Sequence, residues 1–168
     1  MYVFPLPAGW SGVSISNRGV YGLTLPAPSR EEALAGCARS PRETDDEDLF
    51  HTLVAELSAY FAGVRVGLKF PVDLDGYSAF QQHVLRGLTG ISWGDTRTYG
   101  EVAAAVGSPR GARAVGQACG ANRIPLIIPC HRVTAAGGGL GGFGGGLVWK
   151  RRLLALEGTR YPDRQCEE

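Results

Sequence analysis

Residues 126–133 constrain the fold more strongly than any other part of this 168-residue sequence. Residues 126–128 are a short apolar run, which is typical of a buried strand. Pro129 then fixes one backbone dihedral and lacks an amide donor, so the chain must turn there. Cys130 follows, next to a histidine and an arginine, and such neighbours make a reactive thiolate available. The pattern indicates a reactive sulfur on a rigid scaffold, although free cysteine is also a common inert core residue.

The composition, 44% hydrophobic and 20% charged residues, is that of an ordinary globular protein. No apolar run approaches the roughly 20 residues that span a bilayer, and the first twenty residues lack a signal-peptide core. The three histidines lie far apart, and no cluster has the spacing of zinc ligands. We therefore expect a cytoplasmic protein without a metal or a membrane, whose four cysteines are reduced thiols: Cys37, Cys119, Cys130 and Cys166.

Charge divides the chain into two unlike halves. Residues 1–75 contain 6 basic and 10 acidic side chains, whereas residues 76–168 contain 11 and 6. A basic half suggests contact with a polyanion, although random surface variation could produce so small an imbalance. We expect an N-terminal structural α/β domain over residues 1–75 and a C-terminal domain over residues 76–168.

The N-terminal half carries the patterns of a small α+β domain. Alternating apolar residues around Asn17-Arg18-Gly19 predict a hairpin over residues 11–25. Residues 26–42, rich in proline and small residues, are interpreted as a connector. Residues 44–48 include a run of acidic side chains, and the apolar residues that follow recur at helical spacing as far as about Tyr60. The acidic run therefore indicates the start of a helix. Residues 64–72 are predicted to form another strand.

The C-terminal half carries stronger helix signals. A helix is predicted from Tyr77 to Leu88, and Thr98 and Glu101 form a capping box for a second helix ending near residue 106. Ser108 and the following proline predict the start of a third helix, which ends near residue 119. Two short helices joined by a tight turn, with a polar stripe on the second, are typical of a helix-turn-helix, although a helical hairpin with a solvated face remains the alternative. The stripe is Arg110, Arg113 and Gln117.

The last part of the chain combines a glycine-rich loop with a final helix. Residues 134–146 are dominated by glycine and could close over a ligand. They contain a G-x-G-x-x-G pattern, but no βαβ unit surrounds it, so a dinucleotide site is rejected. The final helix is predicted over residues 147–157, with Trp149 on its buried face and Lys150, Arg151 and Arg152 exposed. Glu157 lies where the helix dipole disfavours an anion, which marks a candidate functional position.

Taken together, Arg113-Ala-Val-Gly, Asn122, Ile-Pro-Cys130-His-Arg-Val, the glycine-rich loop and Leu-Glu157-Gly resemble the O6-alkylguanine-DNA alkyltransferase family. The resemblance extends from about residue 80 to residue 158, while the first 75 residues match only in general plan. It implies an α+β fold in which a small ribonuclease-H-like N-terminal α/β domain precedes a mostly helical, winged helix-turn-helix-like domain.

The resemblance also implies roles for individual residues. Cys130 would accept the alkyl group, His131 would act as general base through a water, and Glu157 would orient that histidine. Asn122 would brace the active-site turn, and Tyr99 would donate to the guanine leaving group. Chemistry supports such a relay, because an unperturbed thiol is mostly protonated at neutral pH.

For DNA, the resemblance implies binding of double-stranded DNA through the minor groove by a monomer. The alkylated guanine would be flipped out of the duplex, and Arg113 would fill the vacancy. A thioether product has no easy hydrolysis, so we expect one turnover per molecule and no cofactor, with the 4-oxygen of thymine as a further candidate site of repair. Further residues expected at the DNA are Tyr99, Ser108, Arg110, Gln117, Val133, Gly144 and Gly145.

The sequence departs from the family at two positions and leaves other functions open. The family often has tyrosine at Phe143 and serine at Gly144, which bears on substrate size. One alternative is a non-catalytic protein that senses alkylated DNA, although such relatives lack the cysteine. The others are a DNA-binding regulator with a redox-sensing cysteine and a Cys-His hydrolase.

Overall fold

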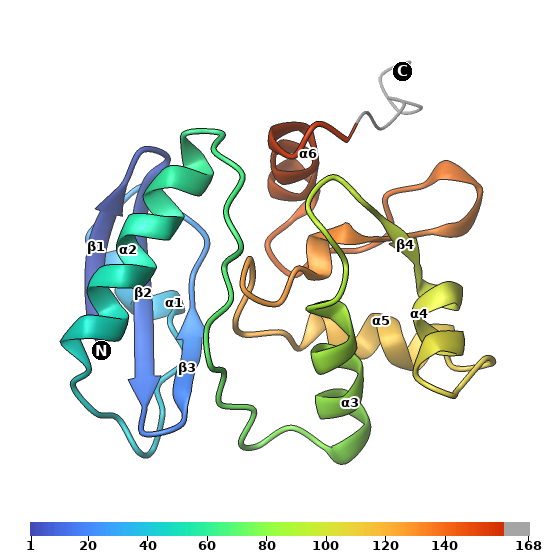
Figure 1. Cartoon of the computed structure of the whole chain (residues 1–168), viewed down its shortest axis with the longest axis horizontal. Coiled ribbons are helices and arrows are strands. Elements are labelled where there is room, and N and C mark those ends of the chain that lie inside the picture. Colours follow the sequence, from blue (N-terminus) through green and yellow to red (C-terminus); the bar gives the residue numbers. More distant parts are fainter. Residues whose placement is uncertain (160–168) are drawn as a thin grey trace. The chain divides into compact units, whose positions relative to one another are not determined.

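The computed structural model describes residues 1–159, which divide into two compact units (Figure 1). The first unit contains residues 1–78 together with residues 123–128, and the second contains residues 79–122 and the chain from residue 129 onward. The chain is therefore a mixed α/β protein. No helix within the described residues is long and apolar enough to cross a membrane.

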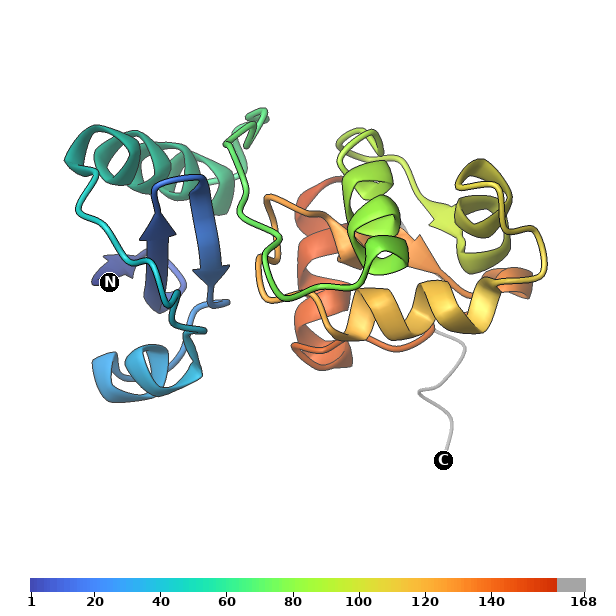
Figure 2. The same cartoon turned by 90° about the horizontal axis from the view of Figure 1, so that it is seen from below.

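A three-stranded antiparallel sheet organises the first unit. Its strands are β1 (Tyr2–Leu6), β2 (Gly9–Ser16) and β3 (Gly19–Leu23), in that spatial order. The β2–β3 pair confirms the predicted hairpin, while β1 was not foreseen. Figure 2 shows α1 (Arg30–Gly36) and α2 (Glu47–Phe61) on opposite faces of the sheet. Apolar side chains from all five elements form the core, among them Phe4, Val13, Ile15, Val20, Ala33, Leu53 and Leu57.

Two local predictions for this unit are wrong. Residues 26–42 were expected to be a connector, but Ser29 caps α1 by accepting from the Glu32 amide at 3.1 Å. The strand predicted over residues 64–72 is absent except for a parallel bridge between Val72 and Val20. Pro71 has no amide to donate, so only its carbonyl pairs, accepting from Val20 at 2.8 Å.

Residues 123–128 belong to the first unit although they lie between elements of the second. The Arg123 carbonyl accepts from the Leu23 amide at 2.9 Å. This hydrogen bond joins the segment to the last residue of β3. The Arg123 guanidinium lies between two aromatic rings, 3.8 Å from the centroid of Tyr21 and 4.2 Å from that of Tyr77. These contacts attach the segment firmly to the sheet unit.

The second unit is mostly helical. It contains α3 (Ala79–Leu88), α4 (Tyr99–Ala105), α5 (Ala112–Gly120) and α6 (Leu147–Leu156). Two short 3-10 helices, η1 (Cys130–Arg132) and η2 (Ala136–Gly138), separate α5 from α6. The strands β4 (Arg97–Thr98) and β5 (Val133–Thr134) pair in parallel, and α3, α4 and α5 pack against one another.

The predicted capping box at the start of α4 is present. The Thr98 hydroxyl accepts from the Glu101 amide at 3.2 Å, and the Glu101 carboxylate accepts from the Thr98 amide at 2.7 Å. The predicted start of the next helix at Ser108 is wrong, because α5 begins at Ala112. The Ser108 carbonyl instead accepts from the Gly111 amide at 2.7 Å, which closes a turn around the intervening proline.

Candidate active site

Cys130 opens η1, at the point where the chain leaves the turn set by Pro129. Cys130 therefore begins a turn of helix, and the strand predicted just before it is wrong. Leu126 has φ 73°, and the Ile127 amide donates to the Pro125 carbonyl at 3.0 Å, so the run folds into a tight turn instead of an extended strand. The run is nevertheless buried, as its apolar character required.

The side chain of Asn122 contacts the Cys130 sulfur at close range. The Asn122 amide nitrogen donates to Sγ at 3.0 Å. Burial raises the pKa of the Cys130 thiol, while the Asn122 hydrogen bond and the charge of Lys150 oppose that rise. The cysteine therefore rests as a thiol, and its reaction requires a group that removes the proton.

His131 has the properties of a base in this position. Its side chain is fully buried, and this burial lowers the pKa of the imidazole despite the opposing effect of Glu157. The ring is thus neutral at neutral pH and able to accept a proton. Nε2 lies 2.8 Å from the Glu157 carboxylate, while Nδ1 has no hydrogen-bond partner within residues 1–159.

Glu157 joins the neutral His131 ring to a buried cation, Arg132. It is the C-terminal cap residue of α6 and is only 4% exposed. Its two oxygens accept from Arg132 Nε and Nη2, each at 2.8 Å, in a bidentate pair. Arg132 also donates to the Ile91 carbonyl at 2.6 Å. This pairing of Arg132 with Glu157 was not predicted, although the position of Arg132 beside the cysteine and histidine was a signal.

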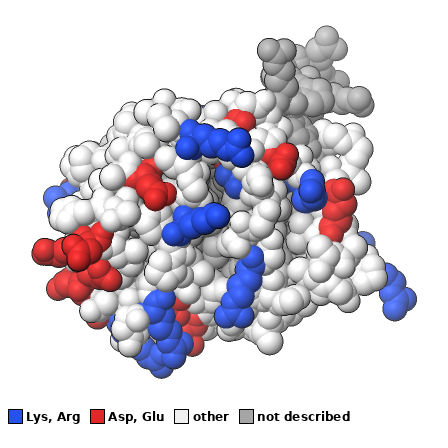
Figure 3. Space-filling model, in the orientation of Figure 1, with Lys and Arg blue, Asp and Glu red and all other residues white. Residues whose placement is uncertain are grey.

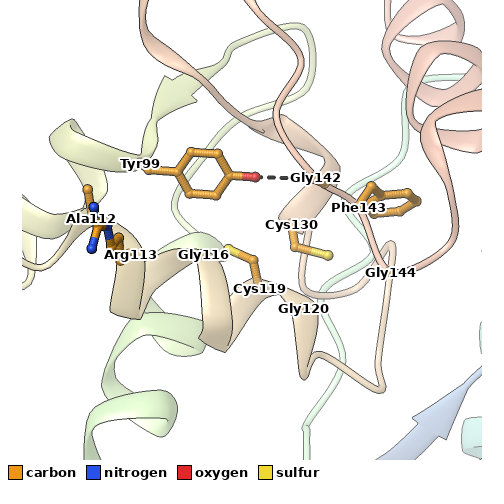
Figure 4. A pocket seen from close by; sticks show the side chains of 10 residues that line it. All are labelled: Tyr99, Ala112, Arg113, Gly116, Cys119, Gly120, Cys130, Gly142, Phe143 and Gly144. Atoms are coloured by element: carbon orange, nitrogen blue, oxygen red, sulfur yellow. Dashed lines mark hydrogen bonds between the residues drawn. The ribbon is translucent and has the colours of Figure 1, made fainter.

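A pocket of about 580 Å³ opens beside Cys130 (Figure 4). One wall is α5 and the other is the glycine-rich loop, with the Tyr99 ring between them. Its lining combines Cys130 with small and aromatic residues and one arginine: Tyr99, Ala112, Arg113, Gly116, Cys119, Gly120, Gly142, Phe143 and Gly144. Cys130 lines the pocket, whereas His131, Glu157 and Asn122 are not among the lining residues.

The glycine-rich loop is anchored at Gly142. The Gly142 carbonyl accepts from the Tyr99 hydroxyl at 3.1 Å and from Lys150 Nζ at 3.0 Å. Lys150 was predicted to be exposed, but its side chain is completely buried and also donates to the Val133 carbonyl at 2.5 Å. Burial lowers the pKa of Lys150 to about 8. The buried Leu153 and Leu154 lie three and four residues after Lys150, on the same face of the helix. This spacing was the signal that Lys150 is buried.

The residues expected at the DNA are spread over several elements. Arg113 is exposed on α5 and lines the pocket, and Gly144 lines the opposite wall. The remaining residues do not line the pocket. Gln117 is exposed on α5, Arg110 and the partly exposed Ser108 lie in the turn before it, Gly145 is exposed in the loop, and Val133 is buried in β5. On the face drawn in Figure 3, basic side chains are scattered and acidic ones gather at the left edge.

The comparisons with known proteins agree with this site. Residues 79–159 match the family model described as "6-O-methylguanine DNA methyltransferase, DNA binding domain". A methylated-DNA–protein-cysteine methyltransferase of Mycobacterium tuberculosis is 49% identical over 119 residues, which cover 71% of this chain and 72% of the relative. The chain belongs to the methylated-DNA–protein-cysteine methyltransferase family.

Solved structures support the family assignment over nearly the whole chain. The M. tuberculosis OGT crystallised in complex with DNA is 39% identical, with a TM-score of 0.75, and the match covers 96% of this chain and 94% of that one. An O6-methylguanine-DNA methyltransferase from Pyrococcus kodakaraensis is 28% identical, with a TM-score of 0.66 and coverage of 94% and 98%. Membership of the family therefore includes the N-terminal unit, whose sequence signals were weak.

Proposed function

We propose that this methyltransferase repairs DNA by moving an alkyl group from the 6-oxygen of guanine to the sulfur of Cys130. The observation that carries the proposal is the position of that sulfur. It faces an open pocket, is held by Asn122, and is adjacent in sequence to a neutral buried histidine. Thymine alkylated on its 4-oxygen is a second candidate substrate, because it presents the same kind of leaving group.

The reaction uses the buried groups in sequence. His131 removes the thiol proton through a water at its unpartnered Nδ1, and Glu157 stabilises the imidazolium that forms. The Cys130 thiolate then attacks the alkyl carbon, and the bond from that carbon to guanine breaks. Tyr99 donates a proton to the departing base, for which its hydroxyl must leave the Gly142 carbonyl. Burial raises the pKa of Tyr99, so the hydroxyl remains a donor.

DNA reaches this pocket from the side of α5. An alkylated guanine inside a duplex is out of reach of Cys130, so the nucleotide is flipped out at a cost of a few kcal/mol. Arg113 is exposed at the pocket wall and fills the gap that the base leaves. The helices α4 and α5 form a helix-turn-helix that enters the minor groove, where Ser108, Arg110 and Gln117 contact the backbone.

The remaining features of the proposal concern the molecule as a whole. The N-terminal domain is ribonuclease-H-like and structural, and the C-terminal domain is a winged helix-turn-helix variant. The protein acts as a monomer. It works in the cytoplasm, where a reducing environment keeps the acceptor thiol reduced.

Mass spectrometry after mixing with duplex DNA that contains O6-methylguanine tests the proposal. We expect the Cys130 peptide to gain one methyl group, with a yield that stops at one equivalent. Cys130→Ala should lose transfer and keep DNA binding. Cys119→Ala is the matched control, since Cys119 lines the same pocket and burial raises its pKa to about 12. Methylation of Cys119, or turnover beyond one equivalent, would overturn the assignment.

The same measurement separates the alternatives. A protein that only senses alkylated DNA would bind the lesion without gaining mass. Relatives at 49% identity carry the name of the methyltransferase, so sensing alone is not favoured. A redox regulator would show DNA affinity that depends on oxidation, and a hydrolase would turn over many ester molecules.

A further inference from the structure

The cluster around the His131 ring is closed to water and contains two opposite charges. The side chains of His131 and Glu157 are completely buried, and the Arg132 side chain is only 10% exposed. Glu157 accepts from His131 Nε2 and, through both of its oxygens, from Arg132. A group of ionisable side chains that has left water is most stable when its net charge is zero. With Arg132 positive and Glu157 negative, that sum is zero only if the imidazole is neutral.

The loop of residues 91–94 holds both partners of this ion pair. The Ile91 carbonyl accepts from Arg132 Nη1 at 2.6 Å, so the nitrogen that Glu157 leaves unused also has a partner. The Gly94 amide donates to the Glu157 carboxylate at 3.5 Å. Gly94 has a φ of 83°, and a Cβ there would lie 3.2 Å from the Glu157 carbonyl oxygen, so glycine suits this close approach. The position of Arg132 is therefore fixed by the fold and not by the pocket.

The charge on Arg132 acts on the ring through the shared carboxylate. Burial lowers the pKa of the His131 imidazole, the adjacent Glu157 carboxylate raises it, and the charges of Arg132 and, less strongly, Lys150 lower it. Lys150 donates to two backbone carbonyls, whereas Arg132 is bonded to the carboxylate itself. The neighbouring Cys130 thiol is neutral at rest. Without Arg132, a proton on the ring would be the nearest way to neutralise Glu157.

We propose that Arg132 is a positioning residue that keeps the His131 ring neutral at rest, ready to accept the Cys130 proton. This inference rests on the proposed function and adds a residue to its proton transfer. A carboxylate can only accept, so the ring proton lies on Nε2 and the lone pair on Nδ1, which has no partner within residues 1–159. The S–H bond breaks, the proton moves through a water to Nδ1, and an N–H bond forms there. Arg132 does not line the pocket and acts through Glu157.

The pH dependence of methyl transfer tests the inference. Single-turnover rates on duplex DNA containing O6-methylguanine are measured for the wild type and Arg132→Gln across the range in which histidine titrates. In Arg132→Gln the ring should take up a proton beside the unmatched carboxylate, so the rise of the rate with pH should move to higher pH. The rate at neutral pH should fall at least about tenfold, and a higher pH should restore it. A merely structural role would lower the rate at every pH.

Two variants control for charge and for damage to the fold. Arg86→Gln removes a positive charge from an exposed position of α3 in the same unit, and it should keep the wild-type profile. The double variant Arg132→Gln/Glu157→Gln removes both charges of the pair. Its profile should return toward that of the wild type, at a lower maximal rate, because the imidazolium then has no counter-charge.

Nitrogen-15 NMR of the imidazole rings measures the same protonation without any methyl transfer, with His131 assigned by the loss of its signals in His131→Gln. At neutral pH the ring should be neutral in the wild type and charged in Arg132→Gln. A charged ring in the wild type would overturn the inference even if no variant folds, and so would an unshifted profile in Arg132→Gln or an equal loss at every pH. If the ring behaves as expected but the wild type transfers no methyl group, the proposed function fails while the control of the ring by Arg132 stands.

Discussion

At the scale of single residues, Glu157 links the proposed base to the scaffold. It accepts from His131 and, in a bidentate pair, from Arg132, all at 2.8 Å and almost out of contact with solvent. A buried carboxylate is tolerable only when its charge is matched, and Arg132 supplies that match. His131 therefore receives a fixed acceptor without having to be charged itself.

Replacement of Glu157 by glutamine tests this arrangement. Glu157→Gln keeps the size of the side chain but leaves the Arg132 guanidinium without a counter-charge, so we expect a loss of about 3–5 kcal/mol in the free energy of unfolding. Methyl transfer should also slow, because the imidazolium at His131 loses its stabilising anion. Urea titration and single-turnover kinetics measure the two effects. Glu31→Gln, at an exposed glutamate of α1, is the control, and a Glu157→Gln variant as stable as this control would contradict the account.

At the scale of elements, the glycine-rich loop is anchored at the Gly142 peptide. Tyr99 and Lys150 both donate to the Gly142 carbonyl, so the loop is attached to the start of α4 and to α6 at once. Next to it, Gly141 has φ 70°, and a Cβ there would lie 2.6 Å from Cε2 of Tyr99. Glycine is needed at Gly141 for both backbone conformation and space.

Gly141→Ala should therefore disturb the pocket wall. A left-handed conformation costs a non-glycine residue about 1–2 kcal/mol, and the added methyl group displaces the Tyr99 ring. We expect methyl transfer to slow at least about tenfold, which corresponds to 1.4 kcal/mol. Binding to undamaged duplex DNA, measured by fluorescence anisotropy, should change little, because the exposed face of α5 is unaltered. Equal losses of binding and transfer would argue against a local effect on the pocket.

Elements defined by neighbouring residues were predictable from the sequence. The capping box at Thr98 and the hairpin of β2 and β3 follow from contacts between residues close in the chain. Cys130, His131 and Glu157 were found together through their resemblance to a family. The same approach missed α1, whose capping serine lies in a stretch dominated by proline and small residues.

Elements decided by distant contacts were not predictable. Residues 126–128 have the composition of a strand, but the chain bends at Leu126, where φ is positive. Lys150 was assigned to solvent by its charge, whereas two backbone carbonyls remote in sequence satisfy its ammonium. Composition cannot reveal such partners, because they exist only after the loop and α6 come together.

At the scale of the whole molecule, buried thiols make stability depend on pH. Burial raises the pKa of Cys37 to about 11 and that of Cys119 to about 12, whereas an unfolded cysteine titrates near 8.5. The folded state keeps protons that the unfolded state loses. The stabilisation is complete below about pH 8.5 and is lost as the pH rises toward 11–12.

We expect each thiol to remove about 1–2 kcal/mol of stability between pH 8 and pH 10. Lys150 acts in the opposite direction, because its lowered pKa means that the unfolded state binds the extra proton over this interval. Urea titrations under a reducing agent should therefore show a steeper decline for the wild type than for Cys37→Ala or Cys119→Ala. Parallel declines in all three proteins would contradict this explanation.

The excursion of residues 123–128 into the first unit has a consequence for how such a gene can evolve. The polypeptide passes between its two units three times. The segment of residues 123–128, between the second and third of these crossings, carries four buried apolar residues: Ile124, Leu126, Ile127 and Ile128. No single crossover point separates the coding regions of the two units. Recombination that replaced only the first 78 codons would have to supply a new packing surface for residues 123–128. The coding regions of the two units are therefore expected to be inherited together.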